Sequence, residues 1–122
     1  MPLQRSGRDA STALSMTNAE VIEIKPDKMP VGKHDKDQES FTLKIVDVQE
    51  GDIVYALTDG FPDQFGGEKG KKYMGAKFKN HLQKISSKSE DEQLKLLSEE
   101  FSLWIRDYEQ IDDVCVMGVK II

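Results

Sequence analysis

Two places in the sequence carry aspartates beside a run of apolar residues. Asp59 and Gly60 come just after the run Ile53–Leu57, and Asp112 and Asp113 stand directly before a second run. A short apolar run bounded by turn residues is typical of a strand that is buried on both faces. We therefore expect Asp59 at the end of one core strand and the Asp112–Asp113 pair at the beginning of another.

These carboxylates would meet at one rim of a sheet if the two strands are antiparallel neighbours. Grouped carboxylates repel one another unless a cation binds between them, and carboxylate oxygens select hard ions such as Mg²⁺ or Mn²⁺. Gly60 would allow a sharp turn or a close approach of the backbone there. The spacing thus indicates a divalent-metal site, with the alternative that both aspartate segments are ordinary turns and caps.

Hydrophobic periodicity predicts the elements that position these acids. In chain order we expect strands at 21–25, 41–48 and 53–58, helices at 73–86 and 90–107, and a last strand at 114–121. The short turn between the second and third strands predicts an antiparallel hairpin. The segment 1–19 is poor in such signals, so we expect a loop or little structure there, followed by one domain at 20–122.

Each predicted helix carries one apolar stripe, which we interpret as core rather than as a ligand-binding face. The stripe residues are Met74, Phe78, Leu82 and Ile85 in the first helix, and Leu94, Leu97, Phe101, Trp104 or Ile105, and Tyr108 in the second. A capping box formed by Ser89 and Glu92 is expected to begin the second helix. We expect the only tryptophan to be buried, and Cys115 to be a buried thiol within the last strand.

The totals of the chain limit its class. Its 122 residues are enough for one domain, and its net charge of −5 argues against a nucleic-acid partner and against an anionic membrane surface. No apolar run approaches the roughly 20 residues that span a bilayer, and we expect no signal peptide. A single cysteine cannot form an intrachain disulfide, which suits a reducing, cytoplasmic location.

Several segments, taken in order, resemble one known family. They are Pro30–Gly32, Gly51–Gly60, Asp63–Gly67, the helix with Trp104, and Gln110–Val116. This set resembles the C-terminal half of the catalytic domain of metal-dependent protein phosphatases, in the SpoIIE-type bacterial branch of the type 2C (PPM) family. The resemblance covers roughly residues 20–122.

The resemblance implies a fold, a chemistry and a set of ligands. The fold would be α+β, an antiparallel sheet with two helices packed on one face, as part of an α/β/β/α sandwich. Asp59 and Asp112 would be ligands of two Mn²⁺ or Mg²⁺ ions, Asp113 a supporting or weak ligand, and Gly60 a backbone position near the site. The reaction would be hydrolysis of phosphoserine or phosphothreonine in a protein substrate, in bacterial signalling.

The sequence departs from the family pattern in one respect. Such enzymes bridge the two ions with an earlier aspartate in an Asp-x-x-Gly-His-Gly-like segment, whereas the only Asp-Gly pair here is Asp59-Gly60 and Gly-His does not occur. A complete family domain is also roughly twice as long. We therefore expect the isolated chain to be inactive, and to associate with itself or with the N-terminal half of such a domain. The alternatives are a non-catalytic interaction module that retains the scaffold, and an unrelated α+β domain with acidic turns.

Overall fold

The computed structural model describes residues 4–5, 9–10, 12–17, 20–27 and 40–122. The chain forms two compact units. The first contains Met1–Asp59 together with Val116–Ile122, and the second contains Gly60–Cys115. The segment Pro30–Gly32, which belongs to the resemblance, lies outside the described residues.

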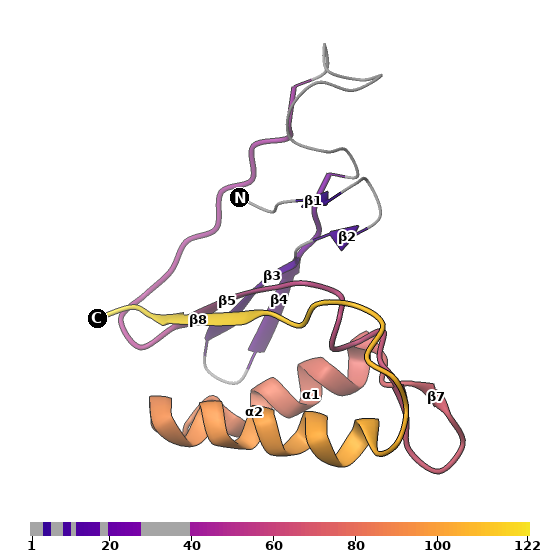
Figure 1. Cartoon of the computed structure of the whole chain (residues 1–122). Helices are drawn as coiled ribbons and strands as arrows, with labels where there is room; N and C mark the ends of the chain where they lie inside the picture. Colours follow the sequence, from indigo (N-terminus) through magenta and orange to yellow (C-terminus); the bar gives the residue numbers. More distant parts are fainter. Residues whose placement is uncertain (1–3, 6–8, 11, 18–19, 28–39) are drawn as a thin grey trace. The chain divides into compact units, whose positions relative to one another are not determined.

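The first unit is built on a four-stranded antiparallel sheet (Figure 1). Its strands lie in the order β4 (Glu20–Ile24), β3 (Thr12–Thr17), β5 (Ile53–Leu57) and β8 (Val116–Lys120). A separate antiparallel pair joins β1 (Gln4–Arg5) to β2 (Asp9–Ala10). The strands predicted at 21–25, 53–58 and 114–121 are thereby confirmed as β4, β5 and β8.

The central strand β5 alternates between two environments. Ile53, Tyr55 and Leu57 are buried, whereas Val54 is half-buried and Ala56 is exposed. A period of two in burial is what a pleated strand produces when one of its faces is covered. The expectation that β5 is buried on both faces is therefore wrong for Ala56.

A glycine on β8 makes room for the largest of these buried side chains. Gly118 pairs with Tyr55, and a Cβ atom at Gly118 would lie 3.0 Å from Cε1 of the tyrosine ring. The ring therefore occupies the space that a side chain on the neighbouring strand would fill.

A turn with a buried carboxylate precedes β5. The carboxylate belongs to Asp52, and it accepts a hydrogen bond from the Gln49 N–H at 2.8 Å.

Two predictions about the first unit are wrong. Phe41–Val48 forms no strand, and Leu43 and Ile45 are 80% and 82% exposed. Instead of the expected hairpin partner, β5 pairs with β3, which lies in the segment 1–19 for which we expected a loop. Alternation of apolar residues shows that a segment can form a strand, but pairing with a distant segment is not encoded in that local pattern.

The second unit contains both helices and a small hairpin. The hairpin joins β6 (Phe65–Gly66) to β7 (Lys71–Lys72), and the helices are α1 (Gly75–Ile85) and α2 (Glu90–Ile105). The predicted helices are thus confirmed, as is the cap of α2, where the Ser89 hydroxyl accepts a hydrogen bond from the Glu92 N–H at 3.3 Å. The first turn of α2 also contains Glu90, Asp91 and Glu92. Their negative charges interact favourably with the positive, N-terminal end of the helix dipole.

Aromatic rings form the core of this unit. The Phe61 ring packs against three others, with centroids 5.0 Å from Tyr73, 4.8 Å from Phe78 and 5.0 Å from Phe101. Such tilted and edge-on contacts are the favoured geometry of aromatic pairs. Tyr73 also lies edge-on to Trp104, with ring centroids 5.3 Å apart.

The apolar stripes of the two helices are buried to different extents. In α1, Phe78, Leu82 and Ile85 are buried as predicted. No residue of α2 is fully buried; Trp104 is half-buried, and Leu94 is 69% exposed. The expectation that both stripes are core is therefore wrong for Leu94, for Tyr108 and for Met74 of the first stripe, and Trp104 is less buried than expected.

The predicted fold class is confirmed: the chain is an α+β protein with antiparallel sheets and two helices. Within the part of the chain that the structure describes, none of the helices has the length and apolar character needed to cross a membrane.

Candidate metal site

The two strands that carry the aspartate motifs are antiparallel neighbours. Leu57, the last residue of β5, pairs with Val116, the first residue of β8. The end of one strand therefore lies beside the beginning of the other, as the predicted convergence requires. Asp59 follows Leu57 by two positions, and Asp113 precedes Val116 by three positions.

Gly60 lies directly against the backbone of the second motif. A Cβ atom built on Gly60 would lie 2.1 Å from the Asp113 carbonyl oxygen and 3.2 Å from Cγ2 of Val114. No side chain fits in that space, so glycine is required by the close approach of two segments and not by its backbone angles. The expected close approach of the backbone at Gly60 is confirmed, whereas its place beside a metal site stays a prediction.

The aspartates of the second motif lie in an irregular segment before β8. The Asp112 carboxylate accepts a hydrogen bond from the Asp113 N–H at 2.8 Å, and the Gln110 side-chain amide donates to the Asp112 carbonyl oxygen at 3.0 Å. Asp112 is half-buried and Asp113 is exposed. This hydrogen bond holds the Asp112 carboxylate in a defined position, and Asp113 is the more exposed of the two residues.

Asp59 and Asp112 offer ligand atoms of the kind that a hard divalent ion prefers, but two carboxylates are too few to complete a binding site. Asp59 and Asp112 are both half-buried and supply only carboxylate oxygens, which suit Mg²⁺ or Mn²⁺. Among the described residues, no group of three or more His, Cys, Asp and Glu side chains is placed to hold a metal ion. Any ion bound by these aspartates would therefore need further ligands.

Cys115 does not occupy the position predicted for it. It is exposed and precedes β8, which begins at Val116. The residues between Asp112 and Val116 lie outside the strand ladder, although the apolar run in the sequence continues through them. The interpretation of Cys115 as a buried thiol inside a strand is therefore wrong.

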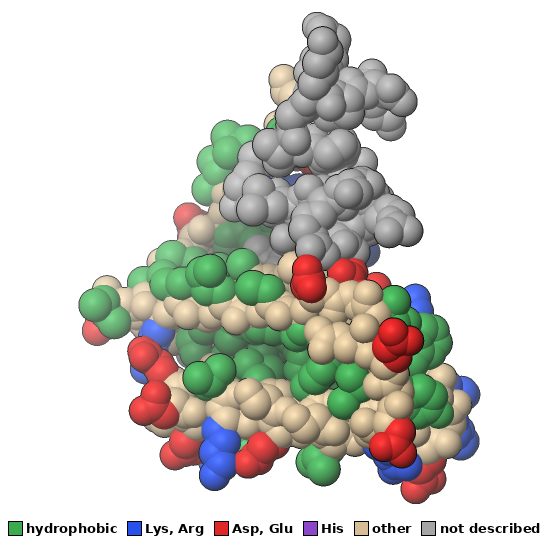
Figure 2. All heavy atoms as spheres, in the orientation of Figure 1, with side chains coloured by type: hydrophobic (Ala, Val, Ile, Leu, Met, Phe, Trp, Pro, Cys, Tyr) green, Lys and Arg blue, Asp and Glu red, His purple; other side chains and the backbone are tan. Residues whose placement is uncertain are grey.

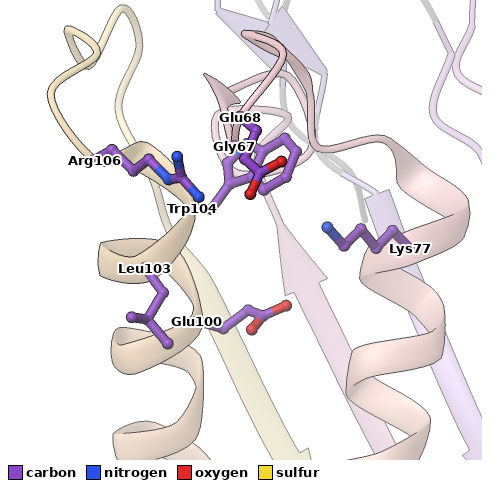
Figure 3. Close-up of a pocket in the computed structure, with 7 residues that line it drawn as sticks. All are labelled: Gly67, Glu68, Lys77, Glu100, Leu103, Trp104 and Arg106. Carbon is purple, nitrogen blue, oxygen red and sulfur yellow. The ribbon is translucent and has the colours of Figure 1, made fainter.

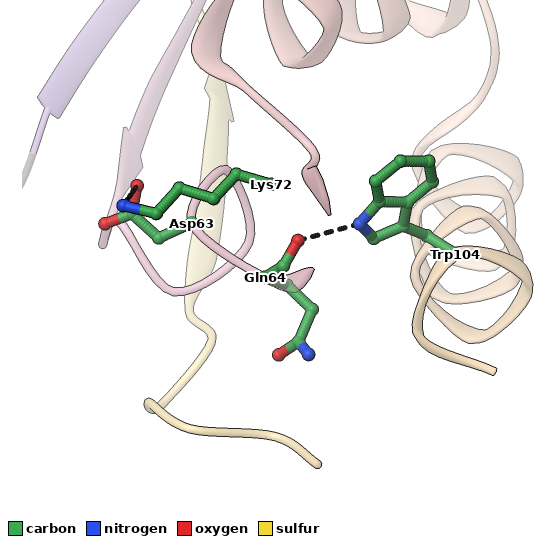
Figure 4. A network of polar contacts seen from close by, with 4 residues as sticks. All are labelled: Asp63, Gln64, Lys72 and Trp104. Carbon is green, nitrogen blue, oxygen red and sulfur yellow. Dashed lines mark hydrogen bonds and ion pairs between the residues drawn. The ribbon is translucent and has the colours of Figure 1, made fainter. Parts of the chain in front are cut away.

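The Asp63–Gly67 loop is fixed by contacts with Trp104, which the sequence analysis did not predict. Gln64 is buried, and its carbonyl oxygen accepts a hydrogen bond from Nε1 of Trp104 at 2.7 Å (Figure 4). In return, the Trp104 carbonyl oxygen accepts a hydrogen bond from the Gly67 N–H at 2.8 Å. Trp104 thus holds the loop by both its side chain and its backbone.

The glycines of this loop have a steric reason. A Cβ atom on Gly66 would lie 2.0 Å from the Trp104 carbonyl oxygen, and one on Gly67 would lie 2.7 Å from Cζ3 of the indole ring. The Gly-Gly pair was the available signal in the sequence, because adjacent glycines often mark a close backbone approach. Nearby, the exposed Lys72 ammonium lies 3.9 Å from the Asp63 carboxylate (Figure 4).

The fold agrees with the comparisons to known proteins. The chain belongs to the SpoIIE family, because the model of the family described as Stage II sporulation protein E (SpoIIE) matches residues 7–122. The expected membership of the SpoIIE-type branch is thereby confirmed.

A solved structure agrees with the family assignment. The SiaA-PP2C domain of Pseudomonas aeruginosa matches with a TM-score of 0.77 and 22% sequence identity. The match covers 97% of this chain and 48% of the solved chain, so the chain spans about half the length of that structure. At this identity the likeness establishes a shared fold. The comparison with curated proteins found no match.

Proposed function

We propose that the chain is part of a phosphatase domain that hydrolyses phosphoserine or phosphothreonine in a protein with the help of Mn²⁺ or Mg²⁺. The observation that carries the proposal is the pairing of Leu57 with Val116, in a chain that belongs to the SpoIIE family. This register sets Leu57, two residues before Asp59, opposite Val116, three residues after Asp113. A cytoplasmic location and a role in bacterial signalling are part of the proposal.

Each motif residue has a distinct role in this proposal. Asp59 and Asp112 supply carboxylate oxygens to the metal, and Asp113 supports the site from its more exposed position. Gly60 leaves the space through which its backbone meets the Asp113 carbonyl group. A metal ion bound there would activate a water molecule and neutralise charge on the phosphate oxygens.

The second candidate is a non-catalytic interaction module on the same scaffold. It is favoured by the sequence, which contains no Asp-x-x-Gly-His-Gly segment. In either case the described residues supply too few donors for a metal ion, so we expect little or no turnover from the 122-residue chain alone.

We also propose that one face of the sheet is covered by another sheet, supplied by a second copy of the chain or by the remaining half of a complete domain. Among the apolar residues that the register places on this face are Ile22, Ile24, Val54, Ala56, Met117 and Val119. Met117 and Val119 are 60% and 51% exposed, and hydrophobic side chains follow β8 in Figure 2. Exposed apolar strands at a sheet edge favour association with another chain.

Calorimetric titration with Mn²⁺ tests the metal site. We expect weak binding by the unaltered chain and its loss in both Asp59→Asn and Asp112→Asn. Asp107→Asn is the matched control, because Asp107 is an exposed acid outside both motifs. Equal binding by all four proteins would contradict the proposed ligands.

Assays of phosphatase activity separate the two candidate functions. We expect no metal-dependent hydrolysis of p-nitrophenyl phosphate by the chain alone. Activity that requires Mn²⁺ and is abolished by Asp59→Asn would instead show that the chain carries a sufficient site by itself.

A further inference from the structure

A pocket of about 310 Å³ lies in the second unit, and none of the aspartates proposed as metal ligands lines it (Figure 3). It is bordered by α1, by the C-terminal end of α2 and by the turn that follows β6. The side chains that face it are Glu68, Lys77, Glu100, Leu103, Trp104 and Arg106. This volume is at the lower end of the range for ligand pockets, about 300–1,000 Å³, and suits one or two residues of a peptide.

The indole ring of Trp104 gives the pocket a rigid apolar wall. Its Nε1 donates to the Gln64 carbonyl oxygen at 2.7 Å, and Gly67 packs so closely on the ring that a Cβ atom would lie 2.7 Å from it. The neighbouring Leu103 is 74% exposed. A fixed aromatic ring beside an exposed leucine can receive an apolar side chain with little loss of conformational entropy.

Two cations border the same pocket. The Lys77 ammonium lies 4.0 Å from the centroid of the Trp104 ring, and Arg106 extends from the end of α2 (Figure 3). Neither forms an ion pair with any of the residues that the structure describes. The Glu100 carboxylate is already engaged, because the Tyr73 hydroxyl donates to it at 2.5 Å. Neither cation therefore has a carboxylate partner among the described residues, although the Lys77 ammonium already packs on the Trp104 and Tyr73 rings.

Arg106 occupies a backbone conformation that favours glycine. Its φ and ψ angles are 49° and −122°, and the turn is closed by a 2.8 Å hydrogen bond from the Tyr108 N–H to the Ile105 carbonyl oxygen. These angles resemble the first central position of a type II′ turn, where glycine is strongly preferred. A side chain kept in a strained conformation is a reason to look for a function of that side chain.

We propose that this pocket docks a segment of a partner protein that presents one carboxylate next to an apolar side chain. The carboxylate would bind Arg106 and Lys77, and the apolar side chain would pack on Trp104 and Leu103. A doubly charged phosphate fits less well, because Glu68 and Glu100 also face the pocket. The proposal needs no metal ion, so it stands or falls separately from the phosphatase function.

The fluorescence of Trp104, the only tryptophan in the chain, provides a direct measurement. The probe is the peptide acetyl-Gly-Leu-Asp-Leu-Gly-amide, and the matched control replaces its aspartate by asparagine. We expect a saturable change with the first peptide and at least about tenfold weaker binding of the second, since a hydrogen-bonded charge contributes about that much. Inorganic phosphate is expected not to displace the peptide.

Two variants test the role of the cations. Arg106→Gly should weaken binding of the aspartate peptide at least about tenfold while raising the melting temperature by a few degrees, because the backbone strain is relieved. Lys77→Gln should also weaken binding. Lys95→Gln removes a positive charge from an exposed position of α2 outside the pocket, and it should leave binding unchanged.

Four results would overturn the proposal. They are no saturable response of the unaltered chain up to about 10 mM peptide, equal binding of the two peptides, unchanged affinity in both Arg106→Gly and Lys77→Gln, or displacement of the peptide by equimolar phosphate. The last result would identify a general anion site instead of a peptide-docking site.

Discussion

The two units of the chain are organised by different kinds of contact. In the first unit, strand register decides which residues lie together, as when Leu57 meets Val116. In the second unit, the packing of aromatic rings and glycines decides which residues lie together. Gly66 and Gly67, for example, fit against Trp104 where no larger residue would. Two strands can keep their pairing when an exposed side chain is replaced, because the hydrogen bonds join backbone atoms. A glycine packed against a ring cannot be replaced without a steric clash.

The two units also differ in where apolar surface stays exposed. The first unit leaves one sheet face with Met117 and Val119 exposed, whereas α1 in the second unit buries Phe78, Leu82 and Ile85. A sheet has two faces and needs a partner for each, while a helix with a single apolar stripe needs only one. We therefore expect substitutions in the second unit to act mainly on stability, and those on the exposed sheet face to act mainly on association.

The largest effect is expected at Gly66. Gly66→Ala would place a Cβ atom 2.0 Å from the Trp104 carbonyl oxygen, and neither backbone segment can yield easily. We expect a loss of at least about 3–4 kcal/mol in the free energy of unfolding, measured by denaturant titration with Trp104 fluorescence. Gly75→Ala is the control, since no atom lies within 4 Å of its Cβ position, and it should change stability by less than about 1 kcal/mol. Similar stabilities of the two variants would contradict the claim that close packing against Trp104 requires glycine at position 66.

A pair of leucine substitutions is expected to give the next largest effect. Leu82 in α1 is 0% exposed and Leu94 in α2 is 69% exposed. Leu82→Ala should therefore cost about 2–5 kcal/mol by leaving a cavity, whereas Leu94→Ala should stay within about 0.5 kcal/mol. The same denaturant titration measures both. A large cost at Leu94 would mean that α2 has a covered apolar face.

An alkaline pH titration compares one buried tyrosine from each unit. Burial raises the pKa of Tyr55 to about 12, and burial together with the Glu100 carboxylate raises the pKa of Tyr73 above its ordinary value. A raised pKa in the folded state means that stability is present below the unfolded value near pH 10 and is lost as the pH rises above it. For Tyr55 the loss should reach about 2–3 kcal/mol by pH 12, at about 1.4 kcal/mol per pH unit.

Phenylalanine variants assign this pH dependence to the two residues. Melting curves between about pH 9 and pH 12 should flatten in part in Tyr55→Phe and further in the double variant with Tyr73→Phe. If both single variants kept the pH dependence of the unaltered chain, neither hydroxyl would be responsible for it.

The smallest effect on stability, and the clearest on association, is expected at Val119. Val119→Lys adds a charge to the apolar sheet face, so it should weaken self-association while changing the free energy of unfolding by less than about 0.5 kcal/mol. Lys120→Gln changes charge at the adjacent position of β8, which points to the opposite face, and serves as the control. Sedimentation velocity measures the outcome. A monomer at high concentration before any substitution would contradict the proposed self-association.

The local elements were predictable from the sequence by itself. The helices at Gly75–Ile85 and Glu90–Ile105, the Ser89 cap and the strand β5 all follow from periodicity and end signals within one segment. The aspartate motifs and their order were sufficient to indicate the SpoIIE family, which the family match confirms. Each of these features depends on neighbouring residues in the chain, so the sequence contains them directly.

Only the tertiary structure decided which segments meet. The pairing of β3 with β5 and the contact of Gly60 with the Asp113 carbonyl group join residues that are distant in sequence. Arg106 and Lys77 likewise reach one pocket from the ends of different helices. Phe41–Val48, by contrast, forms no strand although its pattern predicts one. Many segments of a chain have similar local patterns and could pair with one another. The pairing that forms is the one that gives the lowest free energy for the fold as a whole, which no local pattern contains.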